Sequence, residues 1–117
     1  MFVVYGIKSC DSCRRAIRFL EARNIEYRFH DVREDGVNIQ MLERWAGRID
    51  WEKLLNKQSL TWRKLPEVDR ADMTRGRAFT EMVDKPTLIK RPVIEHEVFI
   101  AVGFSEKRFG EFLDRLG

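Results

Sequence analysis

Two cysteines three residues apart, Cys10 and Cys13, are the residues of this sequence whose type and spacing best suit chemistry. They follow a short apolar stretch and precede a stretch of helical periodicity. A cysteine thiolate is a nucleophile and a metal ligand, so the pair indicates either thiol redox chemistry or metal binding. A zinc site needs two more ligands, and the two histidines, His30 and His96, stand at spacings unlike those of ordinary zinc sites. We therefore favour thiol redox chemistry and expect no bound metal.

The position of the pair makes its two members unequal. The first N–H groups of a helix have no partner within the helix, and the helix dipole is positive there, so a thiolate at a helix start is stabilised. Lys8, Arg14 and Arg15 supply cations near Cys10, although Asp11 opposes them. We predict that Cys10 is the attacking thiolate and that Cys13, one helical turn further on, is less exposed and resolves a mixed disulfide.

Two later segments carry further candidate site residues. In Lys90-Arg91-Pro92-Val93 the proline can be cis, and the loop entering this strand would face the cysteines in a thioredoxin-like sheet. Arg91 would then lower the pKa of Cys10 or hold an anionic substrate, and a surface arginine at a strand edge is the alternative. The loop-like run Thr61-Trp62-Arg63-Lys64-Leu65-Pro66 combines an aromatic side chain with two cations and could border a binding cleft. Packing of Trp62 between the helical insertion and the sheet is the competing interpretation.

The elements that must position these residues follow from hydrophobic periodicity. We predict strands at 2–7, 26–32, 87–89, 92–94 and 98–102, with a turn at 95–97. Helical spacing predicts helices at 11–23, 39–46, 51–55 and 69–83. A last helix, capped by Ser105, runs to the chain end and carries the apolar residues Phe109, Phe112, Leu113 and Leu116.

This order predicts an α/β protein with a thioredoxin-like fold, a mixed four-stranded sheet flanked by helices. We expect one domain over residues 1–117, with a helical insertion at about 38–84 between the β-α-β and β-β-α parts. A chain of 117 residues that is 44% hydrophobic is large enough for one packed core.

Composition argues against several other classes of protein. No stretch approaches the roughly 18–20 apolar residues of a membrane helix, and no basic, apolar leader begins the chain. The net charge of +3 is spread over interleaved acids and bases, unlike a nucleic-acid groove. Arginines outnumber lysines about two to one, so some are candidates for anion binding, although most suit helix surfaces. We expect a cytoplasmic monomer that binds neither membranes nor nucleic acid directly.

The sequence also resembles a known family. The runs YGIKSCDSCRRA, IEYRFHDVREDGV, TWRKL, IKRPV and AVGFSE, in this order from end to end, are similar to the arsenate-reductase-like family of ArsC, Spx and YffB. The similarity is closest to the YffB branch. It implies a thioredoxin fold with an inserted helical region, Cys10 in the reactive position, Arg91 beside it, and Pro92 as the cis-proline that follows.

The resemblance implies three alternative functions. The YffB branch implies a glutathione-dependent thiol–disulfide reductase in which Cys10 attacks and Cys13 or glutathione resolves, with glutathione as co-substrate and glutaredoxin as a further partner. The C-x-x-C resembles Spx, a redox-switched regulator that binds the RNA polymerase α subunit, although the longer charged tail of that branch is missing. The third function is arsenate reduction, for which the family places three arginines around the oxyanion. Here Asn56 and Val102-Gly103 stand where two of these arginines are expected. Lys57 or Arg63 could substitute for a missing arginine.

The predicted site therefore has two parts. The catalytic residues are Cys10, Cys13 and Arg91, and no cofactor is expected to be bound. The predicted substrate-binding residues are Lys8, Arg14, Arg63 and Pro92.

Overall fold

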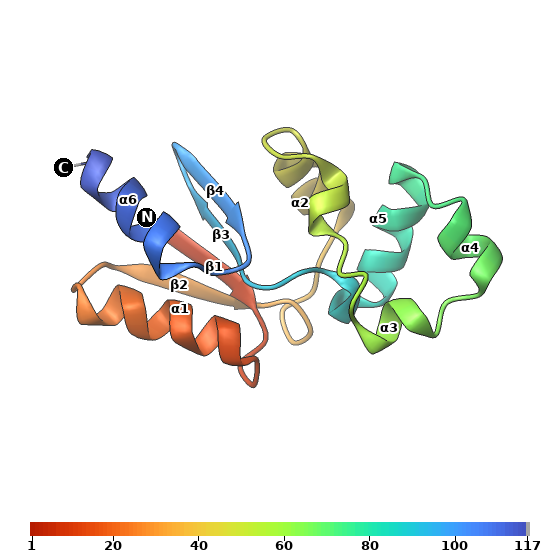
Figure 1. Ribbon diagram of the computed structural model, residues 1–117, viewed down its shortest axis with the longest axis horizontal. Coiled ribbons are helices and arrows are strands. Elements are labelled where there is room, and N and C mark those ends of the chain that lie inside the picture. Colours follow the sequence, from red (N-terminus) through yellow and green to blue (C-terminus); the bar gives the residue numbers. More distant parts are fainter. Residues whose placement is uncertain (117) are drawn as a thin grey trace. The chain divides into compact units, whose positions relative to one another are not determined.

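Figure 1 shows the structure, a computed structural model that describes residues 1–116. The described part leaves out Gly117, the last residue of the predicted domain. It also leaves out the side chain of Leu116, which was predicted to lie on the apolar face of the last helix. The chain forms two compact units. One consists of Met1–His30 together with the chain from Arg91 onward, and the other is Asp31–Lys90.

The first unit is built on a four-stranded sheet in the order β2-β1-β3-β4. The strands are β1 (Phe2–Gly6), β2 (Tyr27–Asp31), β3 (Val93–His96) and β4 (Phe99–Val102). β3 runs antiparallel to both β1 and β4. Helix α1 (Asp11–Ala22) connects β1 to β2, which is the crossover that parallel neighbours require. The mixed four-stranded sheet of a thioredoxin-like α/β protein is confirmed.

Apolar side chains on one face of this sheet form the core of the unit. Phe2 and Val4 share that face because they are two residues apart, and Val4 is paired with Ile94 of β3. α1 packs on it because its buried residues recur at helical spacing, and α6 (Glu106–Leu116) packs on it through two phenylalanines. The buried members are Phe2, Val4, Ala16, Phe19, Leu20, Ile94, Phe109 and Phe112.

The second unit contains four helices and two 3-10 turns. These are α2 (Ile39–Ala46), η1 (Trp51–Leu54), α3 (Leu60–Arg63), α4 (Glu67–Ala71), α5 (Arg75–Asp84) and η2 (Pro86–Leu88). Side-chain oxygens of Asn38, Ser59 and Thr74 cap α2, α3 and α5 by accepting a first-turn N–H. The fully buried side chains include Leu42, Trp45, Leu54, Met82, Leu88 and Ile89.

Two predicted elements of this unit are wrong. The helix expected at 69–83 is interrupted, because Thr74 accepts the N–H of Arg77 at 3.3 Å and so starts α5 anew after α4 has ended. The run at 61–66, expected as a loop, begins inside α3, because Ser59 accepts the N–H of Trp62 at 3.1 Å. Capping side chains decided both cases, whereas apolar spacing alone had set the predictions.

One predicted strand and one predicted turn also differ from the structure. Residues 87–89 do not form a strand, since Pro86–Leu88 is the 3-10 turn η2 and only Ile89 makes a bridge, to Leu55. The turn expected at 95–97 lies later, because β3 continues to His96, which is paired with Phe99. The remaining predicted strands and helices are found within a few residues of their expected bounds.

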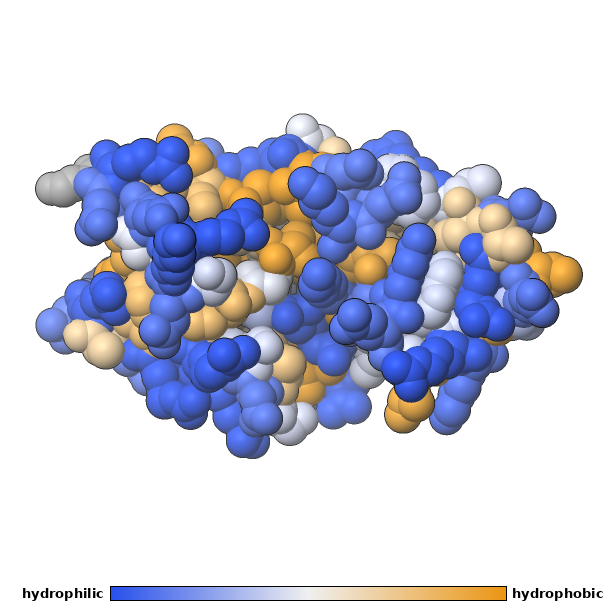
Figure 2. Space-filling model, in the orientation of Figure 1, coloured by the Kyte–Doolittle hydropathy of each residue, from blue (hydrophilic) through white to orange (hydrophobic). Residues whose placement is uncertain are grey.

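The predicted single domain with an insertion at about 38–84 stays a prediction. The compact unit that contains those residues is wider, Asp31–Lys90. Its helices and those of the sheet unit are short, and within residues 1–116 none is long and apolar enough to cross a membrane. Hydrophilic side chains cover most of the face seen in Figure 2.

Candidate active site

Cys10 occupies the turn that joins β1 to α1. Its N–H donates to the carbonyl of Ile7 at 2.9 Å, and its own carbonyl accepts the N–H of Arg14 at 3.0 Å. Its backbone is extended, with φ −80° and ψ 125°, so it is the N-cap residue of α1. The half-buried sulfur therefore lies at the start of the helix, as the sequence predicted.

The surroundings of the Cys10 sulfur favour its thiolate. Burial raises the pKa of Cys10, but hydrogen bonds from the backbone N–H and the thiol of Cys13, the N–H of Ser12 and the side chain of Arg91 outweigh it. The net effect is a pKa below the ordinary value of 9.0. Two of these donors are first-turn N–H groups that α1 leaves without helical partners. The sulfur is thus a thiolate at lower pH than an ordinary cysteine.

The surroundings of Cys13 favour its protonated thiol. Its side chain is completely buried, and this burial raises its pKa to about 12. The N–H of Ile7 partly opposes the rise, while the negative charge of Cys10 and the hydrogen bond to it add to the rise. Cys13 is therefore a thiol that donates to the Cys10 sulfur, and both cysteines are free.

Gly6 makes room for this buried thiol. A Cβ atom at Gly6 would lie inside contact distance of the Cys13 sulfur and 3.2 Å from the Cys13 Cβ. The last residue of β1 must therefore lack a side chain if Cys13 is to occupy the first turn of α1. Sequence reasoning treated Gly6 only as the end of a strand. A glycine inside a strand signals close backbone approach, and that signal could have identified it.

Arg91 and Pro92 come to the site from the loop before β3. The Arg91–Pro92 peptide bond is cis, as the resemblance implied, and Pro92 is fully buried. The N–H of Gly103 donates to the Pro92 carbonyl at 2.8 Å and ties this loop to the end of β4. Arg91 is half-buried and its side chain donates to the Cys10 sulfur. The structure thus brings Cys10, Cys13 and Arg91 together, while the role of Pro92 in substrate binding stays a prediction.

The structure does not single out the other predicted substrate-binding residues. The Nε of Arg14 donates to the Lys8 carbonyl at 3.1 Å, and its Nη1 lies 3.8 Å from the Asp11 carboxylate. Arg14 therefore braces the cysteine turn, and both Lys8 and Arg14 are exposed. Arg63 is exposed on α3, in the other compact unit. Substrate binding by these three residues stays a prediction.

The effect of the Arg91 hydrogen bond on the pKa of Cys10 can be measured in a variant. Replacing Arg91 by leucine removes one donor to the thiolate and should raise the pKa of Cys10. A hydrogen bond to a charged group contributes about 1.5–3 kcal/mol, less where the group is partly exposed. We therefore expect alkylation of Cys10 by iodoacetamide at pH 7 to slow about three- to tenfold. At a pH above the Cys10 pKa of both proteins, the wild type and Arg91→Leu should react equally fast.

A matched control for this variant is Arg28→Leu, which removes an exposed arginine from β2. It should leave the pH dependence of alkylation unchanged. Identical pH profiles for the Arg91→Leu and wild-type proteins would show that the guanidinium does not act on the sulfur.

The two histidines considered as zinc ligands have other neighbours. The His96 Nε2 lies 2.9 Å from the Glu97 carboxylate, and the His30 ring packs 5.1 Å from the Tyr5 ring. Within residues 1–116, no three side chains of His, Cys, Asp or Glu gather closely enough to hold a metal ion.

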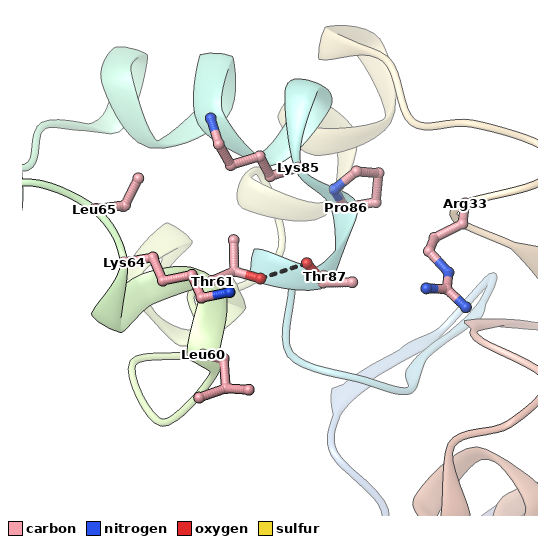
Figure 3. Close-up of a pocket in the computed structure, with 8 residues that line it drawn as sticks. All are labelled: Arg33, Leu60, Thr61, Lys64, Leu65, Lys85, Pro86 and Thr87. Carbon is pink, nitrogen blue, oxygen red and sulfur yellow. Dashed lines mark hydrogen bonds between the residues drawn. The ribbon is translucent and has the colours of Figure 1, made fainter.

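A separate pocket of about 380 Å³ lies within the second unit, between α3 and the junction of α5 with η2 (Figure 3). The hydroxyls of Thr61 and Thr87 share a 2.5 Å hydrogen bond at its centre. Lys85 at its rim is neutralised by Glu81 and Asp84, at 2.9 and 2.8 Å. The remaining lining residues are Arg33, Leu60, Lys64, Leu65 and Pro86. The pocket contains no thiol, so it offers binding but not redox chemistry.

Comparison with known proteins identifies similar chains. The family model of the ArsC family matches residues 5–112. An uncharacterized protein of Haemophilus influenzae is 38% identical over 109 residues, covering 93% of this chain and 96% of the relative. The global transcriptional regulator Spx of Lactiplantibacillus plantarum is 26% identical over 117 residues, covering 98% of this chain and 88% of the regulator.

Solved structures show the same similarity. A YffB protein superposes with a TM-score of 0.89 at 35% identity, covering 95% of this chain and 97% of its own. An arsenate reductase related protein of Brucella melitensis superposes with a TM-score of 0.77 at 36% identity, covering 96% and 93%.

Proposed function

The chain belongs to the ArsC family, and from that premise we propose that it is a glutathione-dependent thiol–disulfide reductase whose nucleophile is Cys10. The observation that carries the proposal is the asymmetry of the cysteine pair. One sulfur is half-exposed and has a lowered pKa, while its neighbour is buried and has a raised pKa. Thiol–disulfide exchange needs one accessible thiolate, and Cys10 fits that requirement.

The first step forms one disulfide bond and breaks another. The Cys10 thiolate attacks the glutathione sulfur of a mixed disulfide, and the substrate leaves as a thiolate that solvent protonates. Cys10 is then bonded to glutathione. The Arg91 side chain, which donates to the Cys10 sulfur, stabilises negative charge at this position before the attack.

The second step regenerates the Cys10 thiolate. A free glutathione thiolate attacks the glutathione sulfur on Cys10, and oxidised glutathione leaves. Attack by Cys13, which would give a Cys10–Cys13 disulfide and release glutathione, is the alternative. Burial raises the pKa of Cys13 to about 12, so Cys13 stays a thiol at pH 7 and is a poor nucleophile. Loss of the Cys10 charge relieves only part of that rise, because burial is its largest cause. We therefore assign resolution mainly to glutathione.

Incubation of the reduced protein with oxidised glutathione tests the proposal. Intact mass and peptide mapping should show a glutathione adduct on Cys10, and added glutathione should remove it. Under turnover, the protein should catalyse reduction of hydroxyethyl disulfide by glutathione. If no glutathione adduct forms, no Cys10–Cys13 disulfide forms and no turnover is measured, the proposed reductase is refuted.

Similarity to Spx supports a second candidate function. The match to this transcriptional regulator extends over 98% of the chain, and the C-x-x-C could act as a redox switch. Pull-down of the RNA polymerase α subunit by the reduced and the oxidised protein separates the two functions. Binding that depends on the state of Cys10 and Cys13 would favour the regulator, and binding in neither state would eliminate it.

Arsenate reduction is less well supported by the residues. An oxyanion beside a thiolate needs several fixed donors. Asn56, which stands where an arginine is expected, uses its side-chain oxygen to accept the N–H of Gln58 at 3.1 Å. The neighbouring Lys57 places its ammonium 5.6 Å from the centre of the Trp62 ring. These side chains have structural partners within their own unit. Arsenate-dependent turnover with glutathione and glutaredoxin would restore this function.

A further inference from the structure

The outer surface of α1 carries a cluster of arginines around a shallow hollow. The hollow has a volume of about 370 Å³ and lies wholly within the sheet unit. Three guanidinium groups and one carboxylate border it, which leaves a net charge of +2 by subtraction. We call this surface the arginine face, and its charged members are Arg15, Arg18, Arg23 and Glu106.

Arg23 is held in place by an aromatic ring. Its guanidinium carbon lies 3.7 Å above the centre of the Phe19 ring, and Phe19 is itself buried. Stacking of this kind fixes the plane of the guanidinium and leaves the N–H groups at its edge directed outward. Such an edge matches a carboxylate, which accepts two parallel hydrogen bonds from it.

The other two arginines are also available to a partner. Arg18 is exposed, and its side chain makes no hydrogen bond or ion pair with any residue from 1 to 116. Arg15 makes one contact, a 3.3 Å hydrogen bond to the hydroxyl of Ser12. The acidic residues of α1 are used elsewhere, because Asp11 pairs with Arg14 and Glu21 accepts the hydroxyl of Tyr27 at 2.9 Å. Among the residues that line the hollow, Glu106 is therefore the one that opposes the positive charge of the arginines.

The arginine face lies on the helix that Cys10 caps. The rise per residue of α1 places Arg15, Arg18 and Arg23 roughly 7 to 20 Å from Cys10 along the helix axis. A folded protein that presents a disulfide to Cys10 would cover this distance with its own surface. Small disulfides would not reach most of it.

We propose that the arginine face binds acidic protein surfaces and thereby selects, as substrates of Cys10, glutathione-modified proteins with carboxylates beside the modified cysteine. This inference rests on the proposed function. The exchange is the one given above: the substrate's cysteine leaves as a thiolate, glutathione is transferred to Cys10, and a second glutathione restores Cys10. The arginines take no part in bond making. They raise the rate of encounter and orient the acidic substrate.

A nucleic acid is the other polyanion that such a surface could bind. Phosphate backbones favour a long basic stripe with little acidic interruption. Here the hollow is bordered by three arginines of one helix and by one carboxylate, Glu106, and forms a short patch rather than a long stripe. A short patch of guanidinium forks suits a protein surface better than a phosphate chain.

Two synthetic peptides test the inference. Each carries one glutathione-modified cysteine, with three glutamates near it in one peptide and three lysines in the other. At low ionic strength we expect the wild-type protein to remove glutathione from the acidic peptide at least about tenfold faster, since electrostatic steering changes association rates by 10–10³. In about 0.5 M NaCl this preference should nearly disappear.

Variants locate the preference on the molecule. The triple variant Arg15→Gln, Arg18→Gln and Arg23→Gln should reduce the ratio of the two rates to about two or less. The matched control Arg44→Gln, Arg48→Gln and Lys53→Gln removes the same charge from the other unit and should keep the ratio. Rates with neutral hydroxyethyl disulfide, measured for each protein, correct for any change in the reactivity of Cys10 itself.

The outcomes separate this inference from the proposed function. No reaction of wild type with hydroxyethyl disulfide would refute the reductase and the inference together. Reaction with hydroxyethyl disulfide but equal rates for the two peptides would overturn only the arginine face as a docking surface. Equal loss of preference in both triple variants would also overturn it. So would tighter binding of a DNA duplex than of the acidic peptide, if the arginine triple variant abolished that binding.

Discussion

Replacing Cys10 by serine should abolish thiol–disulfide exchange at pH 7, whereas replacing Cys13 by serine should leave most of it. A hydroxyl is not an effective nucleophile toward disulfides, so we expect the rate with oxidised glutathione to fall on the order of 10³-fold or more in Cys10→Ser. In Cys13→Ser the hydroxyl can still donate to the Cys10 sulfur, as the Cys13 thiol does. The rate should therefore change by less than about threefold.

The pH dependence of alkylation distinguishes the two thiols further. Because the pKa of Cys10 is lowered, its reaction with iodoacetamide should rise with pH through a midpoint below 9.0 and then level off. Cys13, with a pKa of about 12, should still be gaining reactivity at the highest pH used. Cys10→Ser should remove the first rise and leave only the second.

The variant Cys13→Ala sharpens this comparison. It removes both the second sulfur and the side-chain hydrogen-bond donor to Cys10, so the pKa of Cys10 should increase relative to Cys13→Ser. Equal, ordinary reactivity of both thiols in the wild-type protein would contradict the assignment of Cys10 as nucleophile. Loss of turnover in Cys13→Ser, with the Cys10 adduct still forming, would instead identify Cys13 as the resolving thiol.

Replacing Gly6 by alanine should destabilise the protein by about 1–3 kcal/mol, because overpacking in a tightly packed core costs about that much. The added methyl group would collide with the Cys13 side chain, and both residues are buried. Neither can move freely, since Gly6 belongs to β1 and Cys13 to the first turn of α1. A decrease in Tm of very roughly 10 °C is expected, and calorimetry measures it.

The collision can be tested by removing its partner. In the double variant Gly6→Ala with Cys13→Ala the sulfur is gone, although the two Cβ atoms remain close at 3.2 Å. The double variant should therefore be more stable than the sum of the single changes predicts, by about 1 kcal/mol or more. Gly110→Ala in α6 is a suitable control, because a Cβ there meets nothing within 4 Å. It should leave stability unchanged or raise it slightly.

Local patterns were sufficient to predict the elements of the sheet unit. The spacing of Ala16 and Leu20 predicted α1, because an amphipathic helix buries one stripe whatever it packs on. The patterns failed where side-chain caps compete with apolar spacing. Ser59 and Thr74 start new helices in the second unit, and no periodicity reports a cap.

Local sequence also identified Cys10 and Cys13 as a pair and placed Cys10 at a helix start, because strand, turn and helix are contiguous there. Their differing pKa values were not a local property. Burial of Cys13 depends on the sheet beneath it, the hydrogen bond from Arg91 depends on a loop far along the chain, and the space for the sulfur depends on Gly6. The sequence by itself thus determined which residues carry the chemistry. The helix start already favoured Cys10 as the thiolate, but only the tertiary structure decided how the two pKa values are shifted, because desolvation and hydrogen bonding are set by neighbours that folding brings together.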